Sequence, residues 1–175
     1  MLQYKGKTFI EGLYETLNYL ELSNIICVTG FLDQELRNLL SKTEVQFLHN
    51  PNHMDGMLST LQVGIRHLKE SSNPDAVLVC LTDQPLIAKE YYYSLLDKAI
   101  SSSKNIICSA YQNTMGPPVV FKSKYYDAIL ALPGTASAKK IIKENIADLV
   151  SVDCEEAARD IDTDQDYEHL ISGHE

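Results

Sequence analysis

Residues 77–87 read VLVCLTDQPLI, and this stretch decides the fold. Its first five residues are apolar and include two valines, a composition typical of a strand that is buried on both faces. Pro85 cannot donate a hydrogen bond to a sheet, so the strand ends before it. Asp83 therefore stands where a buried strand leaves the sheet. A strand of this kind is typical of a parallel sheet with helices on both sides.

Outward from this strand, helical and strand-like segments alternate along the chain. Apolar residues recur at three- and four-residue steps in the helical segments, whereas the strands are short apolar runs. A Gly-Pro-Pro turn at residues 115–118 is expected before the run VVF. The alternation predicts an α/β fold of three layers, α/β/α, with a mostly parallel sheet. We expect helices at residues 7–21, 31–40, 57–69, 88–101, 123–132, 136–145 and 164–172, and strands at 24–28, 45–48, 75–82, 105–110 and 149–152.

Composition limits the possible classes of protein. The 175 residues are 45% hydrophobic and 22% charged, which predicts one packed domain over residues 1–175. The 15 Lys and Arg against 24 Asp and Glu give a net charge of −9, so a broad nucleic-acid-binding face is excluded. No apolar stretch is long enough for a membrane span, and the N-terminus lacks a signal-peptide core, so a cytoplasmic protein is expected. The four cysteines form no Cys-x-x-Cys pair and are expected to be structural and mostly buried.

Asp83 is the first candidate functional residue. Ligands of open parallel sheets bind beyond the carboxyl ends of the strands, where Asp83 is expected. A carboxylate there suits magnesium, which takes few protein oxygens and keeps water and phosphate as its other ligands. The alternative is that Asp83 only caps the turn or the next helix. The position favours metal binding.

The segment DGMLSTLQVG, residues 55–64, is the second candidate. Gly56 precedes a helix whose first turn would expose backbone amides and the hydroxyls of Ser59 and Thr60. Helix N-termini attract anions, so a phosphate could bind there. The alternative is that the two hydroxyls are simple helix caps.

The acidic run at residues 159–167, RDIDTDQDY, is the third candidate. A calcium loop counted from Asp160 needs Gly at its sixth position and Glu at its twelfth, but the chain has Gln165 and Ile171, so an EF-hand is excluded. Asp164 and Asp166 are expected in the first turn of the last helix. Asp162, just before that turn, could reach the same metal as Asp83.

Other familiar motifs are absent from the sequence. Gly6, Lys7 and Thr8 look like the end of a phosphate-binding P-loop. That motif also needs a glycine five positions before Gly6, where this chain has Met1. Neither His-Glu-x-x-His nor Gly-x-Ser-x-Gly occurs, which excludes the simplest metalloprotease and serine hydrolase sites.

Taken in order, four motifs resemble the MobA-like nucleotidyltransferases, and among them the molybdenum cofactor cytidylyltransferases. They are NPNHMDGMLSTL at residues 50–61, LTDQPLI at 81–87, GPPVVF at 116–121 and DIDTDQDY at 160–167. The resemblance implies a Rossmann-like sheet of the nucleotide-diphospho-sugar transferase type. It also implies that a nucleotide passes from CTP or GTP to the terminal phosphate of a molybdopterin-type acceptor, with release of pyrophosphate and help from magnesium.

Carried over by position, the resemblance also implies roles for individual residues. Asp83 would be the catalytic aspartate and a metal ligand, and Asp162 a second metal contact. The nucleotide would contact Gly56, Met57, Ser59 and Thr60, and the acceptor would contact Gly116, Pro117 and Pro118. A phosphate nucleophile is already ionised near neutral pH, so no general base is required.

The chain departs from the family at its N-terminus. Gln3 and Tyr4 match the family's segment directly after its first strand and glycine-rich loop, so the first strand is expected to be missing and the domain to be truncated relative to the family. Residues 134–138, GTASA, stand where the family carries an additional carboxylate. Three hypotheses remain: an active cytidylyl- or guanylyltransferase, a non-catalytic relative that binds a nucleotide, a pterin or a partner protein, and a sugar-phosphate nucleotidyltransferase. Met1 could be an internal start of a longer gene product, the sheet could close around the gap, or a partner protein could supply the missing strand; an oligomer is also possible.

Overall fold

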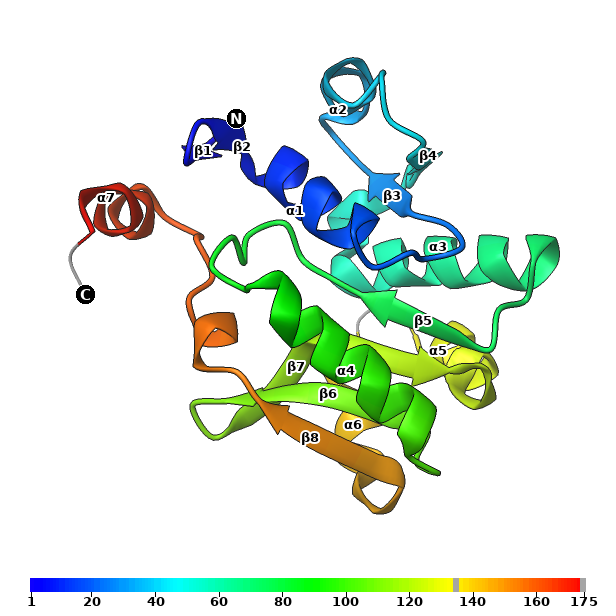
Figure 1. The fold of residues 1–175 in the computed structure, drawn as a ribbon. Coiled ribbons are helices and arrows are strands. Elements are labelled where there is room, and N and C mark those ends of the chain that lie inside the picture. The colour runs from blue at the N-terminus through cyan, green and yellow to red at the C-terminus, as the bar shows by residue number, and fades with distance from the viewer. Residues whose placement is uncertain (134–135, 174–175) are drawn as a thin grey trace.

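The computed structural model describes residues 1–133 and 136–173 (Figure 1). Residues 134 and 135, at the start of the GTASA segment, lie outside the described residues. The helices are α1 Phe9–Asn18, α2 Asp33–Leu39, α3 Met57–Ser71, α4 Lys89–Ser101, α5 Tyr126–Ala131, α6 Lys139–Glu144 and α7 Asp164–Ser172. The strands are β1 Gln3–Tyr4, β2 Lys7–Thr8, β3 Ile26–Thr29, β4 Gln46–His49, β5 Ala76–Val79, β6 Ile106–Tyr111, β7 Thr114–Lys122 and β8 Leu149–Asp153.

In residues 1–133 and 136–173 the strands form three separate groups. The main sheet has the order β5-β7-β6-β8, in which β8 is parallel to β6 and β7 is antiparallel to both of its neighbours. β3 and β4 form a parallel pair of their own, and β1 and β2 form a small hairpin. The predicted α/β class is confirmed, with strands of mixed direction.

The turn predicted at residues 115–118 is wrong. Gly116, Pro117 and Pro118 lie inside β7, and the chain reverses earlier, at Gln112 and Asn113. These two residues have φ of 44° and 60°, the left-handed backbone that a two-residue hairpin turn requires. The pairing of β6 with β7 shifts register after Cys108. The prolines are tolerated there because, at such an irregularity, some backbone N–H groups of the strand donate no hydrogen bond to the neighbouring strand.

Helices cover both faces of the main sheet, as the residue alternation of its strands requires. On one face, Ile106 and Phe121 pack against residues of α3, α5 and α6, including Ile65 and Ile142. On the other face, Leu95 of α4 packs against the neighbouring residues of the same strands. Side chains of β6 and β7 that are 0% exposed, such as Ile106 and Phe121, each stabilise the fold by about 1.5–3 kcal/mol. The layers place β5, and the loop that follows it, in the middle of the molecule (Figure 1).

Most of the expected helices and strands are found, with shorter bounds. The strand expected at 75–82 ends at Val79, before Thr82 and Asp83. Asp164 and Asp166 lie in the first turn of α7, as expected. A Thr163–Asp166 capping box starts this last helix, which Gly173 ends in the left-handed conformation. In the described part of the chain, none of the helices combines the length and the apolar character that crossing a membrane requires.

Candidate functional site

Asp83 lies in the loop that follows β5, as its sequence position predicts. Its backbone carbonyl accepts a hydrogen bond from the Ile161 N–H at 2.9 Å, which ties this loop to the acidic segment before α7. Its carboxylate oxygen Oδ1 is buried and has no hydrogen-bond partner among the residues that the structure describes. Burial raises the pKa of the Asp83 carboxyl, and the negative charges of Asp160 and Asp162 raise it further. The group is therefore a poorly solvated carboxylate that would gain from a cation.

Gln84 joins the three segments that the sequence motifs mark. Its side chain is 3% exposed, and its amide Nε2 donates to the Asp160 carboxylate at 2.9 Å and to the Ala157 carbonyl at 3.0 Å. A longer contact of 3.5 Å reaches the Pro117 carbonyl. The loop after β5, strand β7 and the segment before α7 therefore meet around one amide.

The Gly116–Pro118 segment lies beside this junction. Pro118 is fully buried, and its carbonyl accepts a hydrogen bond from the Ser109 hydroxyl at 2.7 Å. A Cβ on Gly116 would come within 2.6 Å of the Tyr111 hydroxyl, so only glycine fits there without a shift. The predicted acceptor-side residues thus lie next to Gln84, which follows the predicted metal ligand Asp83 in the chain.

The carboxylates near Asp83 suit a hard cation but do not form a complete ligand cage. Asp160 and Asp162 are exposed at the same edge, and both raise the pKa of Asp83 through their charge. Within residues 1–133 and 136–173, no three His, Cys, Asp or Glu side chains are grouped so that they could hold a metal ion by themselves. Magnesium fits such a site, because it binds one or two carboxylates and completes its shell with water and phosphate oxygens.

The second predicted site is organised around Asn50. This side chain is 1% exposed, and its amide donates to the hydroxyls of Ser59 at 2.9 Å and Thr60 at 3.0 Å. The Ser59 hydroxyl in turn contacts the carbonyls of Asn52 and Gly56 at 2.9 and 2.8 Å. These bonds fasten the loop over residues 50–56 to the first turn of α3. Ser59 thus fastens the loop to the helix, which has no side-chain cap hydrogen bond at its start.

Gly56 and Met57 form the start of α3. Gly56 has φ of 96°, a conformation that favours glycine, and it precedes a first turn with no acidic residue. Met57 is 61% exposed. Thr60 lines the same cavity as Thr82, so the start of α3 and the loop after β5 face one space. An anion at the start of α3 would lie beside the cavity that Thr82 also lines.

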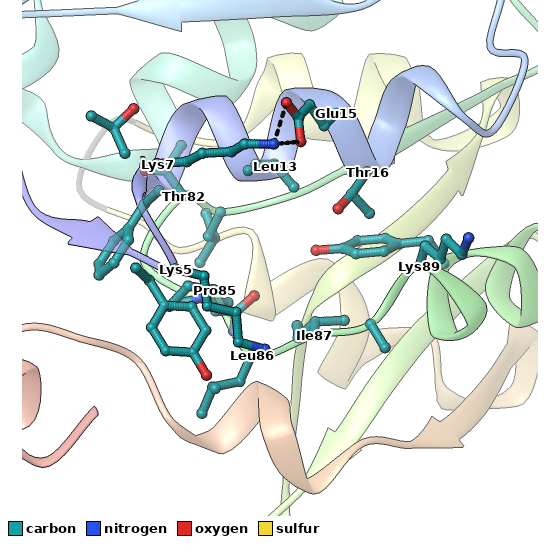
Figure 2. Close-up of a pocket in the computed structure, with 18 of the residues that line it drawn as sticks. Lys5, Lys7, Leu13, Glu15, Thr16, Thr82, Pro85, Leu86, Ile87 and Lys89 are labelled. Atoms are coloured by element: carbon teal, nitrogen blue, oxygen red, sulfur yellow. Dashed lines mark hydrogen bonds and ion pairs between the residues drawn. The ribbon is translucent and has the colours of Figure 1, made fainter. Parts of the chain in front are cut away.

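A second feature of this edge is a pocket of about 430 Å³ between α1, the β1–β2 hairpin and residues 81–89 (Figure 2). Three lysines, Lys5, Lys7 and Lys89, line it, and Lys7 forms an ion pair with Glu15 of α1 at 2.5 Å. Lys5 and Lys89 lie over aromatic rings, at 5.0 Å from Tyr4 and 5.2 Å from Tyr19. In a chain of net charge −9, this is a local concentration of positive charge beside Thr82 and Gln84.

Sequence reasoning missed two parts of this edge. Gln84 carries no charge, and its role depends on partners 73 and 76 residues away, so no local pattern indicates it. The three lysines come from the first hairpin and from the residue that opens α4, and only the fold brings them together. The sequence does offer one indication of this edge, the polar dipeptide Asp83-Gln84 that follows a buried strand.

Several solved structures share this fold. Rv0371c from Mycobacterium tuberculosis superposes with a TM-score of 0.79, covering 98% of this chain and 88% of its own, at 19% identity. The 4-diphosphocytidyl-2C-methyl-D-erythritol synthase from Anaerococcus prevotii also gives 0.79, over 98% and 87%, at 14% identity. The molybdopterin-guanine dinucleotide biosynthesis protein A from Archaeoglobus fulgidus gives 0.68, over 100% and 89%, at 16% identity. At such identities these likenesses establish the fold.

Sequence comparison adds a relative and a family. The chain is 25% identical over 120 residues to the bifunctional protein GlmU of Francisella tularensis subsp. novicida. The match covers 69% of this chain but 25% of that protein, so the chain spans about a quarter of the length of these curated relatives. The family model of the MobA-like NTP transferase domain matches residues 1–150, which include the Asn50 loop, Asp83 and the Gly116–Pro118 segment. The chain belongs to the MobA-like NTP transferase family.

Proposed function

We propose that this chain transfers CMP or GMP from an NTP to the terminal phosphate of a molybdopterin-type cofactor and releases pyrophosphate. One observation carries the proposal: Gln84 brings the loop of Asp83, the Gly116–Pro118 strand and Asp160 to one edge of the sheet. Ligands of open α/β sheets bind at such an edge. The acceptor class rests on the resemblance of the four ordered motifs to the cytidylyltransferase branch.

A divalent cation at Asp83 fits the residues present. The unpartnered Oδ1 and the raised pKa of Asp83 both mark a carboxylate that a cation would stabilise, and Asp162 adds a second oxygen ligand nearby. One related structure, Rv0371c of Mycobacterium tuberculosis, is described as a complex with manganese. Magnesium would offset the charge that develops on the α-phosphate and on the departing pyrophosphate.

The nucleotide is proposed to bind at the start of α3. Met57 opens the helix with a backbone amide that suits a phosphate, whereas the Gly56 N–H donates to the His53 carbonyl at 3.3 Å, and the Asn50 hydrogen bonds hold this turn in place. Lys5 and Lys89, at the neighbouring pocket, can neutralise the β- and γ-phosphates. Lys7 is held by Glu15 and is less available for this purpose.

The acceptor is proposed to contact the segment of Gly116, Pro117 and Pro118 at Pro117, which is half-buried, whereas Gly116 and Pro118 are buried. Proline donates no N–H, so this contact offers shape rather than a hydrogen-bond donor. The acceptor phosphate is the nucleophile, and it is ionised at neutral pH. The chain's task is therefore to hold two anionic substrates in line, and it needs no side chain to remove a proton.

The test measures pyrophosphate release from CTP and from GTP in the presence of molybdopterin and Mg²⁺. Asp83→Asn is expected to reduce the rate at least 100-fold. The control Asp97→Asn removes an exposed carboxylate from α4 and is expected to leave the rate unchanged. Turnover with a sugar phosphate in place of molybdopterin would contradict the proposed acceptor and favour a sugar-phosphate nucleotidyltransferase. Absence of turnover with every NTP, together with nucleotide binding, would establish the non-catalytic alternative instead.

A further inference from the structure

The β1–β2 hairpin and helix α7 meet at Tyr167. The Tyr167 hydroxyl donates a hydrogen bond to the Gln3 carbonyl at 2.8 Å and accepts one from the Gln3 N–H at 3.3 Å. Its ring lies edge-on to the ring of Phe9, with 6.2 Å between the two centroids. Gln3 and Tyr167 are 164 residues apart in the chain, and Figure 1 shows the hairpin and α7 at the same end of the molecule. We call this junction the Tyr167 clasp.

The Tyr167 clasp anchors the hairpin to the later part of the chain. Among the residues that the structure describes, the other hydrogen bonds of residues 2–8 stay within the hairpin or reach α1, as those of Lys7 with Glu15 and of Thr8 with Glu11 do. None of the residues of α1 is buried, so this helix is itself a surface element. The hairpin therefore depends on α7 for its second point of attachment by hydrogen bonds.

α7 continues the acidic segment that lies beside Asp83. The Ile161 N–H donates to the Asp83 carbonyl at 2.9 Å, and Asp162 follows directly in the chain. Thr163 then caps α7 through reciprocal hydrogen bonds with Asp166. Asp162 is therefore held between two fixed points, the backbone bond to Asp83 and the docking of α7 on the hairpin. Because α7 has no buried residue, the clasp accounts for much of this docking.

The hairpin brings positive charge to the same edge of the molecule. Lys5 and Lys7 line the pocket of about 430 Å³, which Thr82 and Gln84 line from the loop after β5 (Figure 2). The clasp thus joins a positively charged wall of the pocket to the negatively charged segment at Asp162. Phosphate groups need the first and a divalent cation needs the second. The two have to be correctly spaced when one ligand carries phosphates and a cation together.

We propose that Tyr167 is a positioning residue, whose hydroxyl sets the distance between the Lys5 wall of the pocket and the Asp83–Asp162 edge. The ligand class that this spacing serves is a di- or triphosphate chelated to a divalent cation. The inference rests on the proposed function and adds to it a residue that touches neither substrate. The alternative is a purely structural tie. Such a tie would change the stability of the whole fold, whereas a clasp between two surface elements changes their local opening.

The first test replaces Tyr167 by phenylalanine, which keeps the ring and removes both hydrogen bonds. Residue-resolved amide hydrogen exchange is measured by NMR on the full chain. The Ile161 amide is bonded to the Asp83 carbonyl and not to Tyr167, so it reports whether the clasp acts on the site. Its exchange is expected to become about 2- to 10-fold faster, the factor that one hydrogen bond contributes to an opening equilibrium. The amide of Ile107, in the core strand β6, is expected to exchange as in wild type.

The second test measures the binding of inorganic tripolyphosphate in the presence of Mn²⁺ by isothermal titration calorimetry. Tyr167→Phe and Lys5→Gln are each expected to raise the Kd about 2- to 10-fold. If Tyr167 acts through the position of Lys5, the loss in the double variant is smaller than the product of the two single losses. A residue that only stabilised the fold would give independent losses, which multiply.

Tyr14→Phe is the matched control. The Tyr14 hydroxyl contacts Asn18 one turn further along α1, at 3.5 Å, so this substitution removes a tyrosine hydroxyl without touching the clasp. The variant is expected to match wild type in both tests. Thermal melts accompany every variant. Tyr167→Phe is expected to keep the Tm of wild type to within about 2 °C, because the hydrogen bonds of the clasp are exposed.

Several results would overturn the proposal. An unchanged Ile161 amide in Tyr167→Phe would show that the clasp does not act on the Asp83 loop. Multiplicative losses of affinity, or a lower Tm together with faster exchange at Ile107, would identify Tyr167 as a structural tie. A wild-type chain that binds no tripolyphosphate would remove the role assigned to Lys5. Neither test uses molybdopterin or follows transfer, so wild-type behaviour of Tyr167→Phe beside turnover of CTP would overturn the clasp and leave the proposed function standing.

Discussion

Replacing Asp83 by asparagine is expected to stabilise the chain while removing its capacity to bind a divalent cation. Burial and the charges of Asp160 and Asp162 raise the pKa of Asp83, so the folded state opposes ionisation of this carboxyl. Asparagine has the same shape without the charge. A buried hydrogen-bonding group left without a partner costs about 1–3 kcal/mol, and more when it is charged. Because Asp83 is only about half-buried, solvent screening reduces this to about 1 kcal/mol.

The sign of the pH dependence follows from the direction of the shift. A carboxyl with a raised folded-state pKa binds its proton more tightly when the chain is folded, so wild type loses stability relative to the variant as the pH rises through that pKa. Below the pKa of the unfolded state both forms are neutral, and the difference disappears. For a chain of this length, about 1 kcal/mol corresponds to a rise in Tm of about 2–4 °C at neutral pH.

The assay is a set of paired thermal melts between pH 4 and pH 8, followed by circular dichroism with and without Mn²⁺. Mn²⁺ is expected to raise the Tm of wild type and of the Asp97→Asn control, and to leave Asp83→Asn unchanged. A lower Tm for Asp83→Asn at pH 7, or a gain that persists unchanged at pH 4, would refute the argument that Asp83 is a destabilised carboxylate.

Three further substitutions test other parts of the structure. Asn50→Ala removes three buried or half-buried hydrogen bonds and is expected to lower the free energy of unfolding by about 3 kcal/mol, measured by urea titration. Gly116→Ala places a Cβ 2.6 Å from the Tyr111 hydroxyl and is expected to cost about 1–3 kcal/mol, much of which Tyr111→Phe should restore in the double variant. Asp148→Asn removes a carboxyl whose pKa the Lys124 ammonium holds well below its usual range. The substitution is expected to lower the free energy of unfolding at pH 7, measured by urea titration. This loss should fade as the pH falls through the pKa of Asp148, because the wild-type carboxyl is then neutral as well.

Local sequence patterns predicted the helices because each helix needs an apolar stripe wherever it packs. They did not predict β7 as a nine-residue antiparallel strand, because its two prolines and glycine are typical of a turn. The real turn at Gln112 and Asn113 lacks the glycine that usually marks a hairpin. The pairing with β6, which decides between the two, depends on tertiary contacts and on a register shift after Cys108.

The candidate site was predictable where its chemistry follows directly from a strand, and unpredictable where it depends on distant partners. Asp83 follows the most apolar strand, so its position at the edge of the sheet could be inferred from the sequence. Gln84 also follows this strand, but its hydrogen bonds are to Ala157 and Asp160, which lie 73 and 76 residues further along the chain. Ser59 stays a predicted ligand contact, and the hydrogen bonds of its hydroxyl with Asn50 and the loop carbonyls are visible only in the three-dimensional arrangement.

The proposed nucleotide contacts and the proposed metal ligand face one cavity. Thr60 at the start of α3 and Thr82 beside Asp83 both line it. α3 is fastened to the main sheet through Ile65, which packs in one cluster with Ile106 and Phe121. In-line transfer depends steeply on the distance between the two substrates, so a substitution that loosens the packing of α3 on the sheet is expected to lower the transfer rate even though it touches neither substrate.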